Sequence, residues 1–450
     1  MKLIDAVKSA GVVGAGGAGF PTHVKLAAQA DTFIINAAEC EPLIETDKYL
    51  MRTFPEELII SAELIATHLK AKRKVIALKS KYKEEIKALS AAIDKHNSSF
   101  ELVQMPSFYP AGDEQILVQF VTGKSVPERG LPLHVGAVVD NVGTVLNVGE
   151  AVAEKPVTDK YLSIVGEVEK PLMLKVPIGT SIKECIEMAK PLISKYDFIL
   201  GGPMMGRVCK GEEAQTEFVT KTTGNVILLP KGHYLVERSE LSISAIAAQT
   251  RSACIQCKMC TDMCPRYLIG HDIRPSQVMR NLYREKTIKD NVEYEHAFGS
   301  AINCCDCGIC EMFACPMGLS PRKVNGYIKG KLAERKINPE KNQSPQVREG
   351  LDWRRIPTDR LIARLGLSKY ASLHVKEPCR EYRPKTVTLY LKQHIGAGAQ
   401  PCRETGEFVQ KGELIGSIGE NALCANLHAS ITGKITFINN EKVVITESEE

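Results

Sequence analysis

The sequence predicts a multidomain protein of mixed α/β class. Three observations carry this prediction. A chain of 450 residues is too long for one hydrophobic core and favours about three domains. The first third alternates apolar strands with helices, which is typical of a parallel sheet. Two dense cysteine runs lie past the middle, and short strands separated by turns fill the end. We expect domains over residues 1–157, 158–236, 237–337 and 386–450, with a linker or docking segment over 338–385.

Composition excludes several classes of protein. The 44% hydrophobic and 25% charged residues are those of an ordinary soluble globular protein. A net charge of +5 without a basic, aromatic stripe gives no sign of nucleic-acid binding. No apolar run approaches the roughly 20 residues of a membrane span. Fifteen cysteines without a secretory signal indicate a reducing compartment, so we expect a cytoplasmic protein.

The first domain begins with a short amphipathic helix that ends at Gly11. A glycine-rich loop, Gly14 to Gly19, follows and leads into a helix expected over 23–30. Such a loop allows close backbone approach and, with a helix N-terminus, forms an anion cradle to which Lys25 would add charge. The alternative is a flexible turn, because the spacing differs from the dinucleotide fingerprint and no strand precedes it.

A parallel sheet with covering helices is expected next. We predict strands over 33–37 and 74–78 and near Leu102, and helices over 55–69, 82–93 and 113–121, then a strand end and helix within 135–150. Glu39 and Glu41 follow the first strand, at the edge where α/β sheets bind ligands; the alternative is a solvated loop. Asp113 opens a helix, where the alternative role is that of a cap.

Short strands begin again near Tyr161. A helix over 182–188 and a strand over 197–200 follow, and then Gly201-Gly-Pro-Met-Met-Gly206, a turn to which we assign no chemistry.

The two cysteine runs predict iron–sulfur clusters. Each run spaces cysteines two residues apart and ends in Cys-Pro, and the fourth ligand of each cluster usually comes from the other run. One 4Fe–4S cluster would take Cys254, Cys257, Cys260 and Cys315, and a second would take Cys304, Cys307, Cys310 and Cys264. The alternative is a pair of structural zinc sites. Cys305 is out of register, and four residues instead of three precede Cys315.

For the remaining segments the sequence predicts secondary structure but no catalytic residues. Helices are expected over 241–250, 275–285 and 321–334, and a docked helix over 360–365. Arg354, Arg355, Arg360 and Arg364 lie in a linker or, alternatively, form a docking surface for an acidic partner. Strands are expected over 387–391, 413–418, 433–438 and 443–446. This tail resembles the barrel-sandwich hybrid of lipoyl and biotinyl carriers, but Gly419 to His428 contains no lysine for a carrier.

Four motifs in one order carry a wider resemblance: Gly-x-Gly-Gly-Ala-Gly-Phe-Pro-Thr, Asn-Ala-x-Glu-Cys-Glu-Pro, Tyr-Pro-x-Gly-x-Glu and Asn-Val-Gly-Thr. They resemble the FMN- and NADH-binding subunit of respiratory complex I and the C subunit of the Rnf electron transport complex. The resemblance implies FMN contacts at Gly14, Gly16, Lys25, Asn36, Glu39, Tyr109, Gly112, Asp113, Asn141 and Thr144, and NADH contacts at Phe20, Glu41 and Glu114. It also implies that residues 158–236 form a β-grasp (soluble-ligand-binding) domain before a dicluster ferredoxin-like domain.

The order of the domains distinguishes between the families that this chain resembles. The Rnf subunit carries its hybrid domain at the N-terminus, whereas here it is C-terminal, as in the cobalamin reductases of propanediol-utilisation microcompartments. That resemblance implies a flavoprotein enzyme that passes electrons from NADH through FMN and two 4Fe–4S clusters to cobalt, from Co(III) to Co(II) and Co(I). The expected setting is a bacterial microcompartment, in which it would support diol dehydratase alongside an adenosyltransferase and the shell. The alternatives are a peripheral Rnf-type subunit and a non-enzymatic scaffold for a corrinoid-handling partner.

Overall fold

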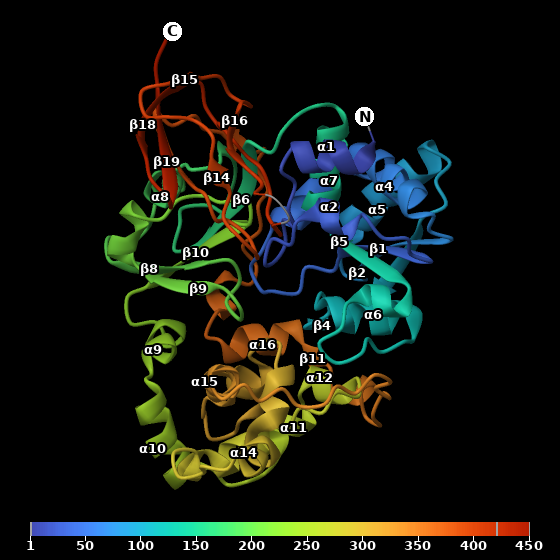
Figure 1. Ribbon diagram of the computed structural model, residues 1–450, viewed down its shortest axis with the longest axis vertical. Helices are drawn as coiled ribbons and strands as arrows, with labels where there is room; N and C mark the ends of the chain where they lie inside the picture. The colour runs from blue at the N-terminus through green and yellow to red at the C-terminus, as the bar shows by residue number, and fades with distance from the viewer. Residues whose placement is uncertain (1, 420–421, 450) are drawn as a thin grey trace.

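The computed structural model describes residues 2–419 and 422–449. Residues 420 and 421, part of the Gly419–His428 tip discussed above, lie outside the described residues. Three parts are visible in Figure 1: the N-terminal α/β domain at upper right, the β-rich parts at upper left, and a helical lobe below them. None of the described helices has the length and apolar character needed to cross a membrane.

The N-terminal domain is built on a four-stranded sheet in the order β3-β2-β1-β5, and every pairing is parallel, as predicted. Because successive strand residues face opposite sides, Phe33 and Ile35 pack into one core and Ile34 into another. The strands are β1 (Thr32–Ala37), β2 (Arg73–Lys79), β3 (Glu101–Met105) and β5 (Ala137–Asn141). The helices are α1 (Leu3–Ser9), α2 (Thr22–Lys25), α3 (Thr46–Thr53), α4 (Pro55–Leu69), α5 (Lys83–Lys95), α6 (Glu114–Thr122) and α7 (Val142–Val152).

Local signals explain where these helices begin and end. Pro55 occupies the first turn of α4, where its missing N–H costs nothing. Asp113 caps α6 by accepting from the N–H groups of the first turn, and Asn141 caps α7 in the same way. The helix expected over 23–30 is shorter, because the chain turns after Lys25 and Ala30 N–H bonds the Leu69 carbonyl at the end of α4.

The second part is a six-stranded mixed sheet in the order β12-β7-β6-β10-β8-β9. Its strands are β6 (Asp159–Gly166), β7 (Leu172–Pro177), β8 (Tyr196–Leu200), β9 (Arg207–Lys210), β10 (Asn225–Pro230) and β12 (Arg380–Glu381), and α8 (Ile182–Met188) packs against it. The strands β6 and β7 form an antiparallel pair, and β10 runs parallel to β6.

The cysteine runs lie in the helical lobe. Its core contains Tyr294, Phe298, Val324 and Ile328. The helices are α9 (Tyr234–Glu240), α10 (Ile243–Ala253), α11 (Met259–Asp262), α12 (Pro265–Leu268), α13 (Pro275–Asn281), α14 (Asn291–Phe298) and α15 (Pro321–Glu334). A π-helical turn spans Cys310–Ala314.

The segment over 338–385 is docked rather than extended. Its strand β11 (Ile356–Pro357) pairs with β4 (Phe108–Tyr109), its helix α16 (Thr358–Arg364) follows, and β12 joins the second sheet. Arg354 donates to the Asp262 carbonyl and so helps to dock this segment, Arg355 pairs with Asp352 within the segment, and Arg360 and Arg364 are exposed.

The C-terminal part consists of two small sheets, in the orders β13-β19-β18-β15 and β14-β16-β17. Their strands are β13 (Thr386–Tyr390), β14 (Gln400–Pro401), β15 (Phe408–Val409), β16 (Leu414–Ser417), β17 (Leu427–His428), β18 (Gly433–Ile438) and β19 (Lys442–Glu447). Val387, Ile415 and Ile435 belong to the same core as Val7 and Leu50 of the N-terminal domain. The two ends of the chain are therefore packed as one body.

Candidate functional site

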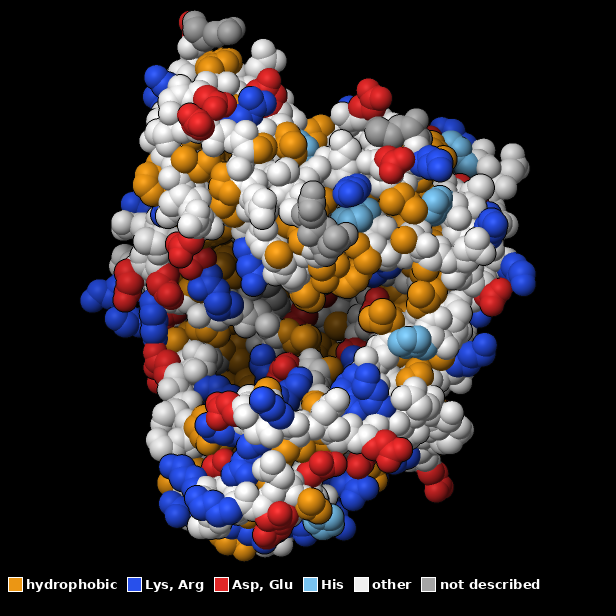
Figure 2. Space-filling model, in the orientation of Figure 1, with side chains coloured by type: hydrophobic (Ala, Val, Ile, Leu, Met, Phe, Trp, Pro, Cys, Tyr) orange, Lys and Arg blue, Asp and Glu red, His pale blue; other side chains and the backbone are white. Residues whose placement is uncertain are grey.

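A cavity of about 1720 Å³ opens at the carboxyl edge of the parallel sheet. Figure 2 shows the hollow in the middle of the face, between the upper domains and the helical lobe. Its walls also include residues of the second sheet and Ile395 of the C-terminal part. Twelve of the thirteen residues predicted to contact FMN or NADH line it: Gly14, Gly16, Phe20, Lys25, Asn36, Glu39, Glu41, Gly112, Asp113, Glu114, Asn141 and Thr144.

The glycine loop is held against the start of α7. Ala15 N–H donates to Thr144 Oγ1 at 2.9 Å, so this buried hydroxyl positions the loop. A Cβ atom on Gly16 would lie 2.6 Å from Asn141 Nδ2, a separation at which something must move. A side chain at position 16 would therefore force the Asn141 side chain to move. A tight backbone loop facing a cavity fits the anion cradle predicted for the FMN phosphate.

Lys25 supplies a positive charge beside this loop. Its Nζ lies 3.4 Å from Asp140, 3.5 Å from Glu114 and 2.6 Å from the Val139 carbonyl. Burial lowers the pKa of Lys25, but the carboxylates of Asp140 and Glu114 outweigh it and the net shift is upward. The lysine therefore stays charged in the cavity wall.

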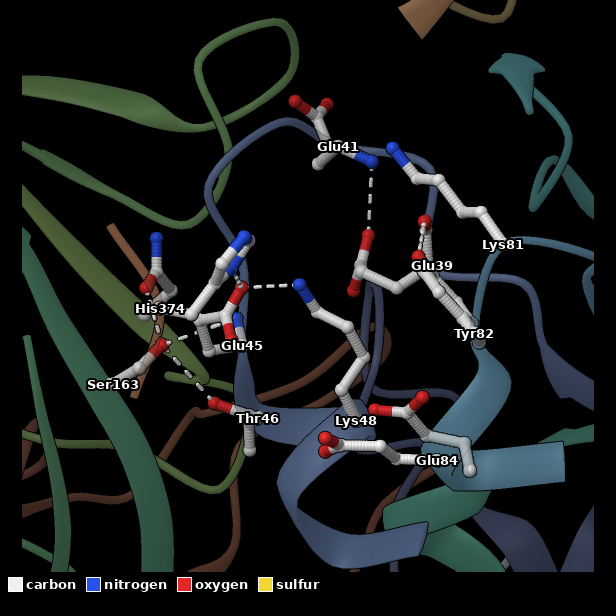
Figure 3. A network of polar contacts seen from close by, with 12 residues as sticks. Glu39, Glu41, Glu45, Thr46, Lys48, Lys81, Tyr82, Glu84, Ser163 and His374 are labelled. Atoms are coloured by element: carbon white, nitrogen blue, oxygen red, sulfur yellow. Dashed lines mark hydrogen bonds and ion pairs between the residues drawn. The ribbon is translucent and has the colours of Figure 1, made fainter. Parts of the chain in front are cut away.

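The loop after β1 carries the two predicted carboxylates (Figure 3). Glu39 Oε1 accepts from Glu41 N–H at 3.0 Å, and Tyr82 donates to the Glu39 carbonyl at 2.9 Å. Glu41 Oε2 accepts from Met204 N–H at 2.9 Å, while its Oε1 is buried without a hydrogen-bond partner. Burial raises the pKa of Glu41 to about 7 and raises that of Glu39 as well. Oε1 of Glu41 is thus a buried acceptor that no group among the described residues satisfies.

The Gly201–Gly206 turn has a role that the sequence analysis did not assign. It folds over Glu41, and a Cβ on Gly202 would lie 2.3 Å from the Glu41 carboxylate. Glycine allows another group to approach the backbone closely, so Gly202 was a sign of such a contact. The sequence could not show that the approaching group is the Glu41 carboxylate.

Two buried charged residues of the site were missed. Asp47 accepts from Asn141 Nδ2 at 2.6 Å, and Lys160 donates to the Ala15 carbonyl at 3.3 Å. Burial raises the pKa of Asp47 and lowers that of Lys160 to about 8. Lys160 thus contacts the glycine loop directly, and Asp47 holds Asn141, the residue beside Gly16. Neither lies in a recognisable motif, and only their charge inside apolar surroundings could have marked them.

The rest of the loop is tied to other parts of the chain, as Figure 3 shows. Glu45 contacts Lys48 and, at 3.0 Å, His374 of the docked segment. Thr46 donates to the Gly224 carbonyl at 2.5 Å and lies 3.4 Å from Ser163 of β6. Contacts from the second sheet and the docked segment therefore hold this wall of the cavity.

Tyr109 differs from the expectation that it surrounds the flavin. Its side chain is 1% exposed and is not among the residues lining the cavity. Pairing of β4 with β11 directs the ring into the core beneath, where its hydroxyl donates to the Cys307 carbonyl at 2.7 Å. Cys307 itself lines the cavity. Tyr109 therefore joins the α/β domain to the second cysteine run at the point where that run reaches the cavity.

The structure brings the predicted cluster ligands together across the two runs. Burial raises the pKa of Cys260 to about 12, and the neighbouring thiols of Cys315, Cys257 and Cys254 raise it further. Burial likewise raises the pKa of Cys310, which has Cys304 and Cys264 as neighbours. Each Cys-Pro cysteine therefore lies with the other run, as crossed ligation requires. Within residues 2–419 and 422–449, no three His, Cys, Asp or Glu side chains are placed so as to hold a metal ion.

The backbone of the two runs repeats. Left-handed residues occur at the same two places in each: Gln256 (56°) and Lys258 (64°), then Asp306 (58°) and Gly308 (78°). In this register Cys304 corresponds to Cys254, and Cys305 corresponds to Ile255. The extra residue before Cys315 lies in the π-helical turn, since such a turn accommodates one more residue than an α-helical turn.

An ion pair joins the α/β domain to the cysteine lobe. Arg266, two residues after Cys264, donates to Asp113 Oδ2 at 2.8 Å, and both side chains are largely buried. The other Asp113 oxygen caps α6. Both carboxylate oxygens are therefore engaged within the protein, which makes Asp113 a residue that positions α6 at the cavity.

Comparisons with known proteins agree with these features. Residues 7–150 match the Nuo51 FMN-binding domain, residues 253–320 the 4Fe-4S dicluster domain, and residues 371–450 the RnfC barrel sandwich hybrid domain. The chain is 39% identical to "Cobalamin reductase PduS" of Citrobacter freundii, over 98% of this chain and 95% of that protein. The chain belongs to the cobalamin reductase PduS family. A Salmonella typhimurium PduS is also 39% identical, over 99% and 96% of the two chains.

More distant relatives cover less of the chain. The C subunit of a proton-translocating ferredoxin:NAD(+) oxidoreductase complex from Clostridium ljungdahlii is 30% identical over 63% of this chain and 60% of that protein. Among solved structures, an NAD+-reducing [NiFe]-hydrogenase in the H2-reduced state matches with a TM-score of 0.50 and 21% identity, over 75% of this chain and 63% of that one. This last likeness concerns the fold alone. The expected complex-I-like flavin domain, dicluster domain and C-terminal barrel-sandwich domain of a PduS-type chain are confirmed.

Proposed function

We propose that this chain is a flavin iron–sulfur oxidoreductase that transfers electrons from NADH to the cobalt of cobalamin, from Co(III) to Co(II) and then to Co(I). The observation that carries the proposal is the contact between the cavity and Cys307. A single hollow, lined by the residues predicted for FMN and NADH, ends at a cysteine predicted to ligate an iron–sulfur cluster. The full-length likeness to cobalamin reductases supports the choice of acceptor.

The chain's own residues would hold the flavin in this cavity. The Gly14–Gly19 loop would bind the phosphate with its N–H groups, and Lys25 would neutralise the anion. Asn36 and Gly112 already form one wall, since Asn36 Nδ2 donates to the Gly112 carbonyl at 2.9 Å. FMN, when bound, converts the two-electron chemistry of a hydride donor into single-electron transfers.

NADH would enter from the open side of the same cavity. Phe20 would stack against the nicotinamide, and Glu41 and Glu114 would accept hydrogen bonds from the dinucleotide. Glu41 lines the cavity, and its buried Oε1 has no hydrogen-bond partner among the described residues. Tyr109 would not contact either molecule and instead would fix the distance between the cavity and Cys307.

Two 4Fe–4S clusters would be held by crossed ligation. The first would use Cys254, Cys257, Cys260 and Cys315, and the second Cys304, Cys307, Cys310 and Cys264. The repeated left-handed residues support Cys304 as a ligand of the second cluster. Cys305 lies beside Cys264 and Cys307 and is the alternative ligand at this position.

The domain limits follow the same proposal. The α/β domain would comprise residues 1–157, a β-grasp domain 158–236, the cluster lobe 237–337, the docked segment 338–385 and the hybrid domain 386–450. Parallel pairing of β10 with β6 beside an antiparallel β6–β7 hairpin and α8 supports the β-grasp assignment. We place the enzyme in the cytoplasm, within a bacterial microcompartment, where an adenosyltransferase would use its reduced cobalamin and diol dehydratase the resulting coenzyme.

The experiment compares Cys257→Ala with Cys305→Ala after anaerobic reconstitution. Cys257→Ala should keep FMN but lose about half of the roughly eight iron atoms of the native protein, and it should no longer reduce hydroxocobalamin with NADH. Cys305→Ala should keep both clusters. Native-rate cobalamin reduction by Cys257→Ala would refute the electron path, and a colourless wild-type protein would favour a non-enzymatic scaffold.

A further inference from the structure

We propose that cobalamin docks on an exposed apolar surface beside Cys257, which we call the exit patch and define as Ile255, Cys257, Met259 and Met317. The inference deepens the proposed function and rests on it. It names the place where the acceptor meets the protein, at the opposite end of the electron path from the flavin cavity.

The two cysteine quartets differ in what they face. The quartet predicted for the second cluster reaches the cavity through Cys307. Among the described cysteines of the two runs, Cys257 is the most exposed, whereas Cys254, Cys260, Cys304 and Cys305 are half-buried and the others are buried. The path therefore has a direction: it enters at Cys307 and leaves at Cys257. Because electron tunnelling slows steeply with distance, the cobalt must approach the cluster that lies at the surface.

Exposed apolar side chains lie close to Cys257 in the chain. Ile255 is 60% exposed, Met259 40% and Met317 46%. Single exposed apolar residues are common on proteins, but these three flank ligands of one cluster from both cysteine runs. Met317 follows Cys315-Pro316, and Cys315 lies with Cys257 around Cys260. Unbranched methionines adapt to partners of irregular shape, such as the methyl-bearing faces of a corrin ring.

The charges beside the exit patch suit cobalamin as its occupant. Arg251 and Lys258, close to the exit patch in the chain, are both exposed. The carboxylate of Asp262, also close in the chain, lies 3.9 Å from Arg354, which offsets its negative charge. The nucleotide loop of cobalamin carries one phosphodiester anion. A ring with apolar faces and a single anionic tail complements apolar side chains bordered by exposed cations.

The electron balance of the step is simple. One NADH gives two electrons, which reduce two cob(III)alamins to two cob(II)alamins and leave NAD+ and one proton. Each cobalt accepts one electron at the exit patch and releases its axial water. The patch itself contributes binding and orientation, and it contributes no acid or base.

The test uses the reconstituted holoenzyme and hydroxocobalamin. The variant Ile255→Glu/Met317→Glu places two carboxylates in the exit patch, and Leu192→Glu, at an exposed apolar residue outside the cluster lobe, is the matched control. Binding is measured by ultrafiltration and by quenching of the fluorescence of Trp353, the single tryptophan. Trp353 is adjacent in the chain to Arg354, which contacts Asp262 of α11 in the cluster lobe. Iron content and NADH-dependent bleaching of the flavin are measured in every variant.

We expect the double variant to bind hydroxocobalamin at least tenfold more weakly and to reduce it correspondingly more slowly at low concentration. Its iron content and flavin bleaching should stay at the wild-type level, as should every property of Leu192→Glu. Wild-type binding and reduction by the double variant would overturn the exit patch and leave the proposed function standing. A wild-type enzyme that bleaches with NADH but neither binds nor reduces cobalamin would overturn both.

Discussion

Substitution of Gly16 by alanine tests the glycine loop at its closest contact. The added Cβ would lie 2.6 Å from Asn141 Nδ2 and 2.7 Å from Asn141 Cγ, so the asparagine side chain must move. Asn141 makes two hydrogen bonds that such a movement breaks: it caps α7 at Gly143 N–H (2.9 Å) and donates to Asp47 (2.6 Å).

The size of the effect follows from these two bonds. Loss of a helix cap costs about 1 kcal/mol. Loss of a hydrogen bond to a charged group costs about 1.5–3 kcal/mol. The free energy of unfolding of the α/β domain should therefore fall by about 2–4 kcal/mol, which lowers Tm by roughly 5–15 °C for a domain of this size. The loss should appear without FMN, and FMN retention should fall as well.

Calorimetry of the flavin-free protein measures this loss, and ultrafiltration measures FMN retention. Gly17→Ala is the matched control, because a Cβ there has nothing within 4 Å, and its Tm should stay within about 1 °C of wild type. Asn141→Ala should cost about as much as Gly16→Ala, and the double variant about as much as either alone. Simple addition of the two losses would refute the collision with Asn141.

Three further predictions concern buried charges. Burial holds the pKa of Glu41 at about 7, above its ordinary 4.5, so the folded protein retains a proton that the unfolded chain releases and stability falls as pH rises between these values. Glu41→Gln should flatten that part of a urea-unfolding profile, and an unchanged slope would contradict the assignment. Asp113→Asn keeps the α6 cap but leaves the buried Arg266 unpaired, which should lower stability by about 3 kcal/mol, with partial recovery in Asp113→Asn/Arg266→Gln. A neutral single variant would argue against the ion pair. Lys221→Met leaves the carbonyls of Gly11 and Asn426 without their shared donor, at about 1–3 kcal/mol each, so limited proteolysis should release the C-terminal part faster, whereas wild-type proteolysis would count against this contact.

The sequence predicted elements well wherever a local signal marked both ends. Proline in the first turn and an unbroken helical period define α4 and α15, whose observed bounds equal the predicted ones. The two-residue strands β4, β11 and β12 were missed, because pairing between distant segments creates them and nothing in their own residues requires a strand.

The residues of the site also fall into those that a local motif predicted and those that only the fold brings to the cavity. Gly16, Asn36 and Glu41 line the cavity as predicted. Each belongs to a short sequence motif, so it could be recognised without knowing which distant residues the fold brings beside it. Asp47 and Lys160 were missed because only the fold brings them to Asn141 and to the Ala15 carbonyl. Tyr109 belongs to a motif, yet its hydroxyl bonds the Cys307 carbonyl, a partner almost two hundred residues later that the motif could not reveal.

The path from the cavity to cobalt is tested most directly by one anaerobic titration. NADH is added stepwise to the reconstituted protein, hydroxocobalamin follows, and the flavin, cluster and cobalt absorbance bands are recorded together. The flavin and cluster bands should bleach with NADH and recover in step with the appearance of cob(II)alamin, at two cobalts per NADH. Flavin and clusters that stay reduced while cobalamin remains Co(III) would contradict the proposed path.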